Sequence, residues 1–74
     1  MPKLPVVKPK IVLKKLKKIG FFIDHVTGSH YILYKENHPT PVTVPIHNKD
    51  LKPGTIHGIL EQSGLTVDEF LKIK

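Results

Sequence analysis

Residues 21–47 read FFIDHVTGSHYILYKENHPTPVTVPIH, and this stretch indicates a three-stranded antiparallel sheet. Segments rich in β-branched and aromatic side chains favour strands, and we expect strands at residues 21–26, 30–35 and 41–46. Thr27-Gly28 indicates a tight turn between the first two strands. Residues 37–40 contain Asn and Pro, which favour a loop before the third strand.

Helical patterns lie on both sides of this stretch. A first helix is expected from Pro9 to Gly20, because proline suits a first turn and glycine stops a helix. A second helix is expected from Pro53 to Gly64. Thr66-x-x-Glu69 is a capping box and should open a short third helix. Ahead of the helices, the spaced prolines of residues 1–8 favour an extended arm.

The order α-β-β-β-α predicts an α+β fold, with a three-stranded antiparallel sheet and helices on one face. Double-stranded-RNA-binding domains have the same order. We expect residues 1–74 to form a single domain, and Pro45, which has no N–H, to place the third strand at a sheet edge. The expected core draws on both layers and consists of Val12, Leu16, Ile19, Phe21, Leu33, Val42, Val44, Ile46, Ile56, Ile59, Leu60 and Phe70.

The composition favours a polyanionic partner. Twelve lysines, no arginine and six acidic residues give a formal net charge of +6. Such a domain attracts nucleic acid, and lysine binds phosphates as a point charge with little reading of bases. The lysines on the polar face of the first helix are Lys14, Lys15, Lys17 and Lys18, and they form either a phosphate contact or a solvated surface. Without cysteines or a long apolar run, we expect a soluble cytoplasmic protein with no membrane contact.

The expected loop predicts how two histidines pair. If residues 37–40 form a symmetric connection, Leu33 opposes Val44, and His30 opposes His47. The two imidazoles would then stand on the face that the helices leave open, with Cβ atoms about 4.5–5.5 Å apart. That arrangement suits RNA cleavage without a metal, because imidazole acts as base or acid near neutral pH. The residues alone also allow a structural role for either histidine.

A metal site is the alternative use of these histidines. If a tight turn spans Val26–Ser29, His25 pairs with His30, and three histidines in a row could hold zinc. The row lacks a carboxylate and no helical metal spacing occurs, so we assign no metal and no cofactor. His38 and His57 are expected at the surface.

The order and spacing of several motifs resemble the HicA family of small toxins. These motifs are Met1-Pro2-Lys3-Leu4-Pro5, Gly20-Phe21, Gly28-Ser29-His30, a valine-rich strand ending Pro45-Ile46-His47, a helix led by Gly54-Thr55 that closes at Gly64, and residues 66–70. HicA toxins are ribonucleases that cleave messenger RNA, share the fold of double-stranded-RNA-binding domains, and are silenced by a HicB-type antitoxin. The resemblance implies one HicA-like toxin domain of a type II toxin–antitoxin system, with His30 as its catalytic residue.

The resemblance also sets expectations for the rest of the site. It implies a metal-independent endoribonuclease whose partners are messenger RNA and a HicB-type antitoxin that covers the open sheet. Gly28 fits a turn and lets a backbone approach closely, while Ser29 either donates to a phosphate or ends the turn. The alternative is a non-catalytic RNA-binding module of the same fold, and a third possibility is a metal-binding or purely structural protein.

Overall fold

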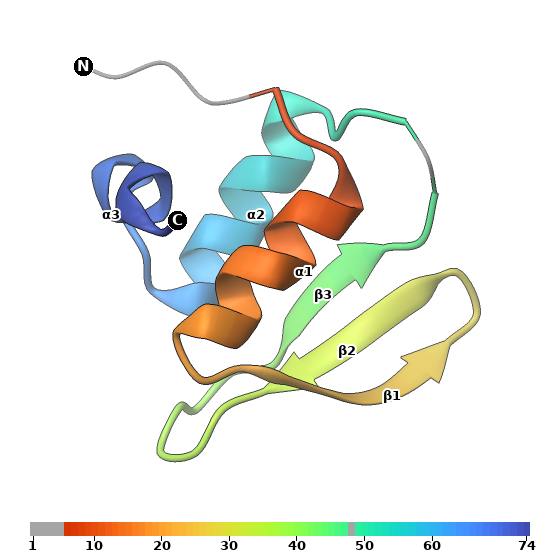
Figure 1. Ribbon diagram of the computed structural model, residues 1–74. Coiled ribbons are helices and arrows are strands. Elements are labelled where there is room, and N and C mark those ends of the chain that lie inside the picture. The colour runs from red at the N-terminus through yellow and green to blue at the C-terminus, as the bar shows by residue number, and fades with distance from the viewer. Residues whose placement is uncertain (1–5, 48) are drawn as a thin grey trace.

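A computed structural model describes residues 6–47 and 49–74, in which helices and strands follow the expected order. The elements are α1 (Pro9–Lys18), β1 (Phe22–Thr27), β2 (His30–Tyr34), β3 (Val42–Pro45), α2 (Pro53–Ser63) and α3 (Val67–Lys72). The sheet order is β1-β2-β3, and the helices lie on one side of it (Figure 1). The α+β fold predicted from the sequence is therefore confirmed.

Only part of the expected N-terminal arm, residues 1–8, lies within the described residues, which begin at Val6. The backbone carbonyl of Val7 accepts a hydrogen bond of 2.8 Å from the N–H of Leu51. Between Val6 and Lys8 the chain has no helix or strand before α1 begins at Pro9. None of the described helices is long and apolar enough to span a membrane.

The face of the sheet that packs on the helices was predicted correctly, but the register between β2 and β3 was not. Leu33 pairs with Val42 and Tyr31 with Val44, so each pair is shifted by two residues from the expected alignment. A shift of two keeps every side chain on its face. Leu33, Val42 and Val44 are accordingly fully buried.

The connection between β2 and β3 explains the shift, because the chain turns at Lys35–His38, closer to β2 than the symmetric loop over residues 37–40 that was expected. The N–H of His38 donates to the carbonyl of Lys35, and Asn37 between them adopts a left-handed φ of 63°. His38 Nε2 lies 2.6 Å from the carbonyl oxygen of Gln62 in α2. The His38 ring also packs edge-on against Phe21, with 5.2 Å between ring centroids. His38 therefore anchors the loop and is half-buried, which corrects the prediction of a surface position.

The core lies between the sheet and the three helices. Ten of the twelve expected core residues are buried, and Ile19 is partly buried against them. Ile46 is 36% exposed because β3 ends one residue before it, so its assignment to the core was wrong. Leu51, which the sequence pattern did not reveal, is buried in the segment leading to α2. Phe70 of α3 is fully buried and so joins the short helix to the common core.

Phe70 and Phe22 offer a matched test of this packing. Phe70 has no exposed surface, whereas Phe22 is 51% exposed on the outer side of β1. We expect Phe70→Ala to lower the free energy of unfolding by about 3–5 kcal/mol, since it leaves a cavity in the core. Phe22→Ala should cost less than about 1 kcal/mol, the range of a cross-strand contact. Urea titration of both variants measures the difference, and equal losses would contradict the placement of α3.

The capping box of α3 is confirmed in both directions. The Thr66 N–H donates to Glu69 Oε1 at 2.9 Å, and the Glu69 N–H donates to Thr66 Oγ1 at 3.1 Å. The hydrogen bond from the backbone N–H of Thr66 is the largest cause of the lowered pKa of Glu69. The hydrogen bond with the Thr66 side chain and the positive charge of Lys72 lower this pKa further. The ionised carboxylate is thus the form that the fold stabilises.

The lowered pKa of Glu69 gives a pH dependence with a definite sign. Because the folded pKa lies below the unfolded one, the carboxylate stabilises the fold above its ordinary pKa. That contribution is lost as the pH falls through the folded pKa. We expect Glu69→Gln to weaken the acid dependence of the thermal midpoint, and Asp68→Asn to change it less. Thermal unfolding followed by circular dichroism between about pH 2 and pH 7 tests this, and identical acid limbs would contradict it.

Candidate active site

The Gly28-Ser29 turn sets the position of His30. Gly28 has a φ of 53°, and Ser29 is not among the residues with positive φ. A two-residue hairpin with glycine in the first central position and positive φ only there has the pattern of a type II′ turn. Thr27 therefore pairs with His30, not His25 as a turn over Val26–Ser29 would require. The exposed Gly28 has open space where a Cβ would project, so its backbone conformation alone favours glycine there.

His30 begins β2 on the face that the helices leave open. It pairs with Thr27 on one side and with Pro45 on the other, and its side chain is half-buried. Within residues 6–47 and 49–74, no hydrogen bond holds its ring. The interpretation of His30 as a strand histidine bonded to the backbone thus finds no support in this part of the chain.

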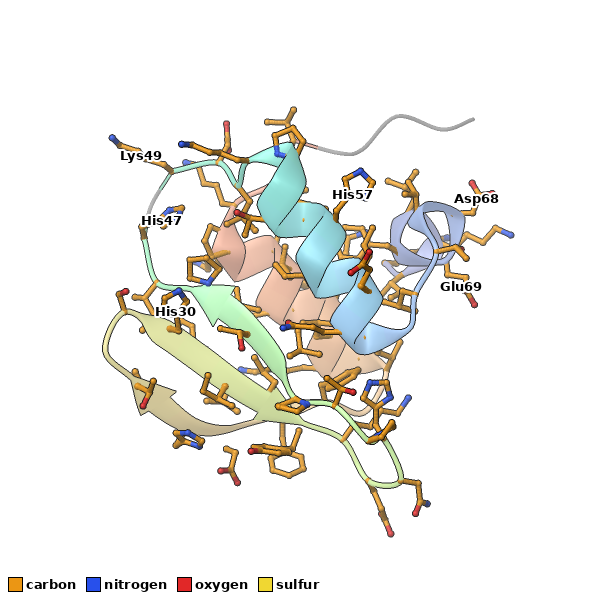
Figure 2. All side chains as sticks on the ribbon, turned by 180° about the vertical axis from the view of Figure 1, so that it is seen from behind. His30, His47, Lys49, His57, Asp68 and Glu69 are labelled. Carbon is orange, nitrogen blue, oxygen red and sulfur yellow. The ribbon has the colours of Figure 1, made fainter. Side chains whose placement is uncertain are left out.

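His47 does not stand opposite His30, which corrects the expected pairing. β3 ends at Pro45, so His47 lies in the loop that follows and is exposed. The two histidines nevertheless share one corner of the molecule, together with Lys49 (Figure 2). A backbone hydrogen bond of 2.7 Å from the Ile46 N–H to the Ser29 carbonyl joins the residues that precede them. This bond continues the β2–β3 register by one position beyond His30 and Pro45, and so brings the two imidazoles into the same region.

The hydrogen bonding of His47 determines which ring nitrogen carries its proton. The Lys49 N–H donates to His47 Nδ1 at 3.2 Å. An accepting Nδ1 carries no hydrogen, so the neutral ring has its proton on Nε2. His47 thus presents an N–H donor from Nε2 when it is neutral.

A bulge in β1 decides where His25 lies. The register shifts between Ile23 and His25, so that Ile23 pairs with Leu33 and His25 pairs with Ile32. His25 therefore lies on the open face but is paired with Ile32, not with His30, and the row of three histidines that the alternative zinc site would need does not form. Among the described residues, no three His, Asp or Glu side chains come together as a metal site would require.

The four lysines proposed to bind phosphate divide into two groups. Lys15 Nζ donates to the carbonyls of Phe70 and Ile73 at 3.1 and 2.7 Å, and it lies 4.9 Å from the centre of the Phe70 ring. Lys18 Nζ donates to the carbonyl of Lys74. Both ammonium groups therefore stabilise the C-terminal end of α3. Lys14 and Lys17 are exposed and line a shallow groove of about 420 Å³ along α1.

Lys10 extends this second group toward the histidine corner, and sequence reasoning missed it. Lys10, Lys14 and Lys17 have the i, i+4, i+7 spacing of one helix face. Lys10 also lines a groove of about 270 Å³ together with Tyr31, Ile46 and His47. The two grooves share Lys10 and Leu13, so the cationic stripe continues into the region of His47. Extending the helical spacing back by one turn from Lys14 would have found it.

Lys35 and His57 lie away from this corner. Lys35 Nζ is 5.6 Å from the centre of the Phe21 ring, on the core side of the sheet. His57 is exposed on α2, across the molecule from His30 (Figure 2). Lys49 lies in the loop after β3 and lines a groove of about 570 Å³ together with His47 (Figure 2).

This chain combines an α+β fold, an open sheet face, a Gly-Ser-His turn and a lysine-bearing first helix, and known proteins resemble it in sequence and fold. The family model described as "HicA toxin of bacterial toxin-antitoxin" matches residues 9–65. The chain belongs to the HicA toxin family. A solved structure of a toxin–antitoxin complex from Streptococcus pneumoniae contains a chain with 29% identity and a TM-score of 0.65. The match covers 82% of this chain and 100% of that chain. A comparison with curated proteins finds no match.

The division of the lysines is testable through paired substitutions on α1. We expect Lys15→Glu to lower the thermal midpoint, because it removes donors from the carbonyls of Phe70 and Ile73. Lys14→Glu should leave the midpoint nearly unchanged, since an exposed charge contributes little to stability. Differential scanning calorimetry of the two variants makes the comparison. An equal decrease of the thermal midpoint in the two variants would show that the contacts of Lys15 do not stabilise α3.

Proposed function

We propose that this HicA-family toxin is a metal-independent endoribonuclease that cleaves messenger RNA, with His30 in direct contact with the scissile phosphate. The observation that carries the proposal is the position of His30 in the Gly-Ser-His turn. The turn presents the half-buried ring on the open sheet face, at the same corner as His47, and the lysine stripe of α1 reaches the groove beside His47 from the helix side. In this proposal, a polyanion bound along that stripe meets His47 first and crosses the β3 edge of the sheet to reach His30.

The reaction requires proton transfer at two oxygens. A 2′-hydroxyl loses its proton as it attacks the neighbouring phosphorus, and the departing 5′-oxygen gains one. Imidazole suits both tasks near neutral pH, and each contributes about 10²–10⁴ to the rate. His30 supplies one of these two transfers. No metal is needed in this scheme, because the lysines and N–H donors compensate the negative charge that develops on the phosphorane.

In this proposal, His47 and the lysines that do not contact α3 bind phosphate groups of the RNA. His47 presents Nε2–H in its neutral form, so it donates to a non-bridging phosphate oxygen. Lys10, Lys14 and Lys17 contact phosphates of the flanking nucleotides, and Lys49 adds a cation beside His47. Gly28 and Ser29 let the RNA backbone approach the turn. Because lysines bind phosphates without reading bases, the affinity should fall steeply with salt and depend little on sequence.

The proposed protein partner is a HicB-type antitoxin that covers the open sheet face. The similar chain from Streptococcus pneumoniae comes from a toxin–antitoxin complex, which supports a partner of this kind. The open face carries exposed apolar side chains, among them Phe22 and Tyr34 at 51% and 38% exposure. An antitoxin bound there would bury these rings and block access to His30 at once. The cytoplasm, where messenger RNA and antitoxin occur together, is the expected site of action.

Purified protein incubated with single-stranded RNA and EDTA tests the activity. We expect cleavage to continue in EDTA and to vanish in His30→Ala, whose thermal midpoint should stay close to that of the parent. His57→Ala is the matched control, because this histidine is exposed on α2 and should retain full activity. Loss of activity that tracks unfolding would assign His30 a structural role. RNA binding without cleavage by the parent protein would favour the non-catalytic RNA-binding module.

A second measurement tests the binding of phosphates by α1. We expect Lys14→Glu combined with Lys17→Glu to weaken RNA binding. On single-stranded RNA, the slope of log affinity against log salt should become shallower by about 0.7 for each phosphate that the variant no longer neutralises. Fluorescence anisotropy at several salt concentrations gives this slope. Lys72→Glu combined with Lys74→Glu is the control for net charge, because both lysines are exposed and the pair changes the charge by the same amount. Equal slopes for both variants would remove α1 from the RNA-binding surface.

A further inference from the structure

Asp24 and His25 form a hydrogen-bonded carboxylate–imidazole pair on the edge strand β1. His25 Nδ1 lies 2.8 Å from Asp24 Oδ2, and each side chain is 49% exposed. An ionised carboxylate only accepts hydrogen bonds, so Nδ1 carries the hydrogen. The neutral ring therefore keeps its lone pair on Nε2. This is the reverse of His47, whose Nε2 carries the hydrogen.

The bulge at Asp24 places this imidazole on the same face as His30. His25 pairs with Ile32, and His30 lies two residues before Ile32 on the same strand. The two histidines are therefore diagonal cross-strand neighbours, a relation in which Cβ atoms lie somewhat less than about 7–8 Å apart. Two ring nitrogens that each make a hydrogen bond of about 2.6–3.2 Å leave room for one phosphodiester between them. Without the bulge, Asp24 would take the place opposite Ile32 on the open face, and His25 would turn to the core side of the sheet.

Resting on the proposed function, we infer that His25 is the general base of RNA cleavage, that Asp24 is its positioning residue, and that His30 is the general acid. His25 Nε2 takes the proton of the 2′-hydroxyl while the 2′-oxygen forms a bond to phosphorus. The bond from phosphorus to the 5′-oxygen breaks, and that oxygen takes a proton from His30. The products are a 2′,3′-cyclic phosphate and a free 5′-hydroxyl. Proton exchange with water then restores both imidazoles.

Asp24 acts in this scheme by fixing the ring and by stabilising the imidazolium that forms. A carboxylate on Nδ1 holds a histidine in the tautomer that exposes Nε2, and it lowers the energy of the protonated ring. The other titratable groups facing His25 come from β2. Tyr34 has its ring centroid 6.5 Å from that of His25, and His30 is the diagonal neighbour. The helices pack on the opposite side of the sheet (Figure 1).

The two proton transfers are separable with a modified substrate. The linkage that the parent protein cleaves is first mapped in an oligoribonucleotide, and the same oligonucleotide is then prepared with sulfur in place of the 5′-oxygen at that linkage. A thiolate leaves without protonation because thiols are far more acidic than alcohols. Loss of the general acid is therefore repaired by sulfur, whereas loss of the base is not.

We expect His30→Ala to cleave the sulfur substrate within about tenfold of the parent rate, although it fails on the oxygen substrate. His25→Ala should lose about 10²–10⁴ in rate on both substrates. It should also lose the rise of rate with pH on the acid side of the profile, where the base must be unprotonated. Asp24→Asn should lower kcat with little change in KM, because the ring stays near the substrate in the wrong tautomer. His57→Ala serves as the control, and circular dichroism checks that each variant is folded.

Three outcomes would overturn the assignment. Full activity of a folded His25→Ala protein would reduce Asp24 and His25 to an exposed ion pair, which contributes little. Rescue of His25→Ala by the sulfur substrate would make His25 the acid instead. A parent protein that cleaves neither substrate would remove the proposed ribonuclease function itself, and that result is known before any variant is compared.

Discussion

Side-chain alternation along β2 constrains the core and the candidate site together. Leu33 is fully buried against the helices, and Tyr31 on the same side is half-buried, so His30 and Ile32, which alternate with them along the strand, must face outward. A slip of one residue would expose Leu33 and turn the imidazole toward the core, which the loss of buried apolar surface opposes. The packing of Leu33 therefore holds His30 on the open face, although the two side chains lie on opposite faces of the sheet.

The parts of the fold that local chemistry determines could be predicted from the sequence. Proline at the start of α1 and α2, glycine after α2 and the Thr66–Glu69 box marked the helices closely. The period of two placed Leu33, Val42 and Val44 in the core. Cross-strand partners were predicted less well. The β2–β3 register depends on His38, which reaches Phe21 and Gln62, and such contacts between distant segments leave no local signal.

For the candidate site, the sequence identified His30 and its face but not the residues around it. Two backbone irregularities account for the difference. Glycine occupies the first central position of the hairpin turn, which moves Thr27 opposite His30, and the bulge at Asp24 moves His25 to the open face. The lysines also show that the sequence alone does not determine which contacts a residue makes. Their helical spacing marked a polar face, but only the position of α3 separates Lys15, which binds carbonyls, from Lys14, which faces solvent.

The hydrogen bonds from Lys15 to Phe70 and Ile73 also affect when this fold can finish forming during synthesis. These hydrogen bonds join residues that are 55 and 58 positions apart in the chain. Closing so long a loop costs conformational entropy before any contact repays it, and such topologies fold more slowly than those with local contacts. During synthesis, α1 must wait for α3 to emerge before it acquires these partners. α1 therefore reaches its packed form only after α3 has been translated, so the N-terminal helix is among the first parts of this fold to be made and among the last to be completed.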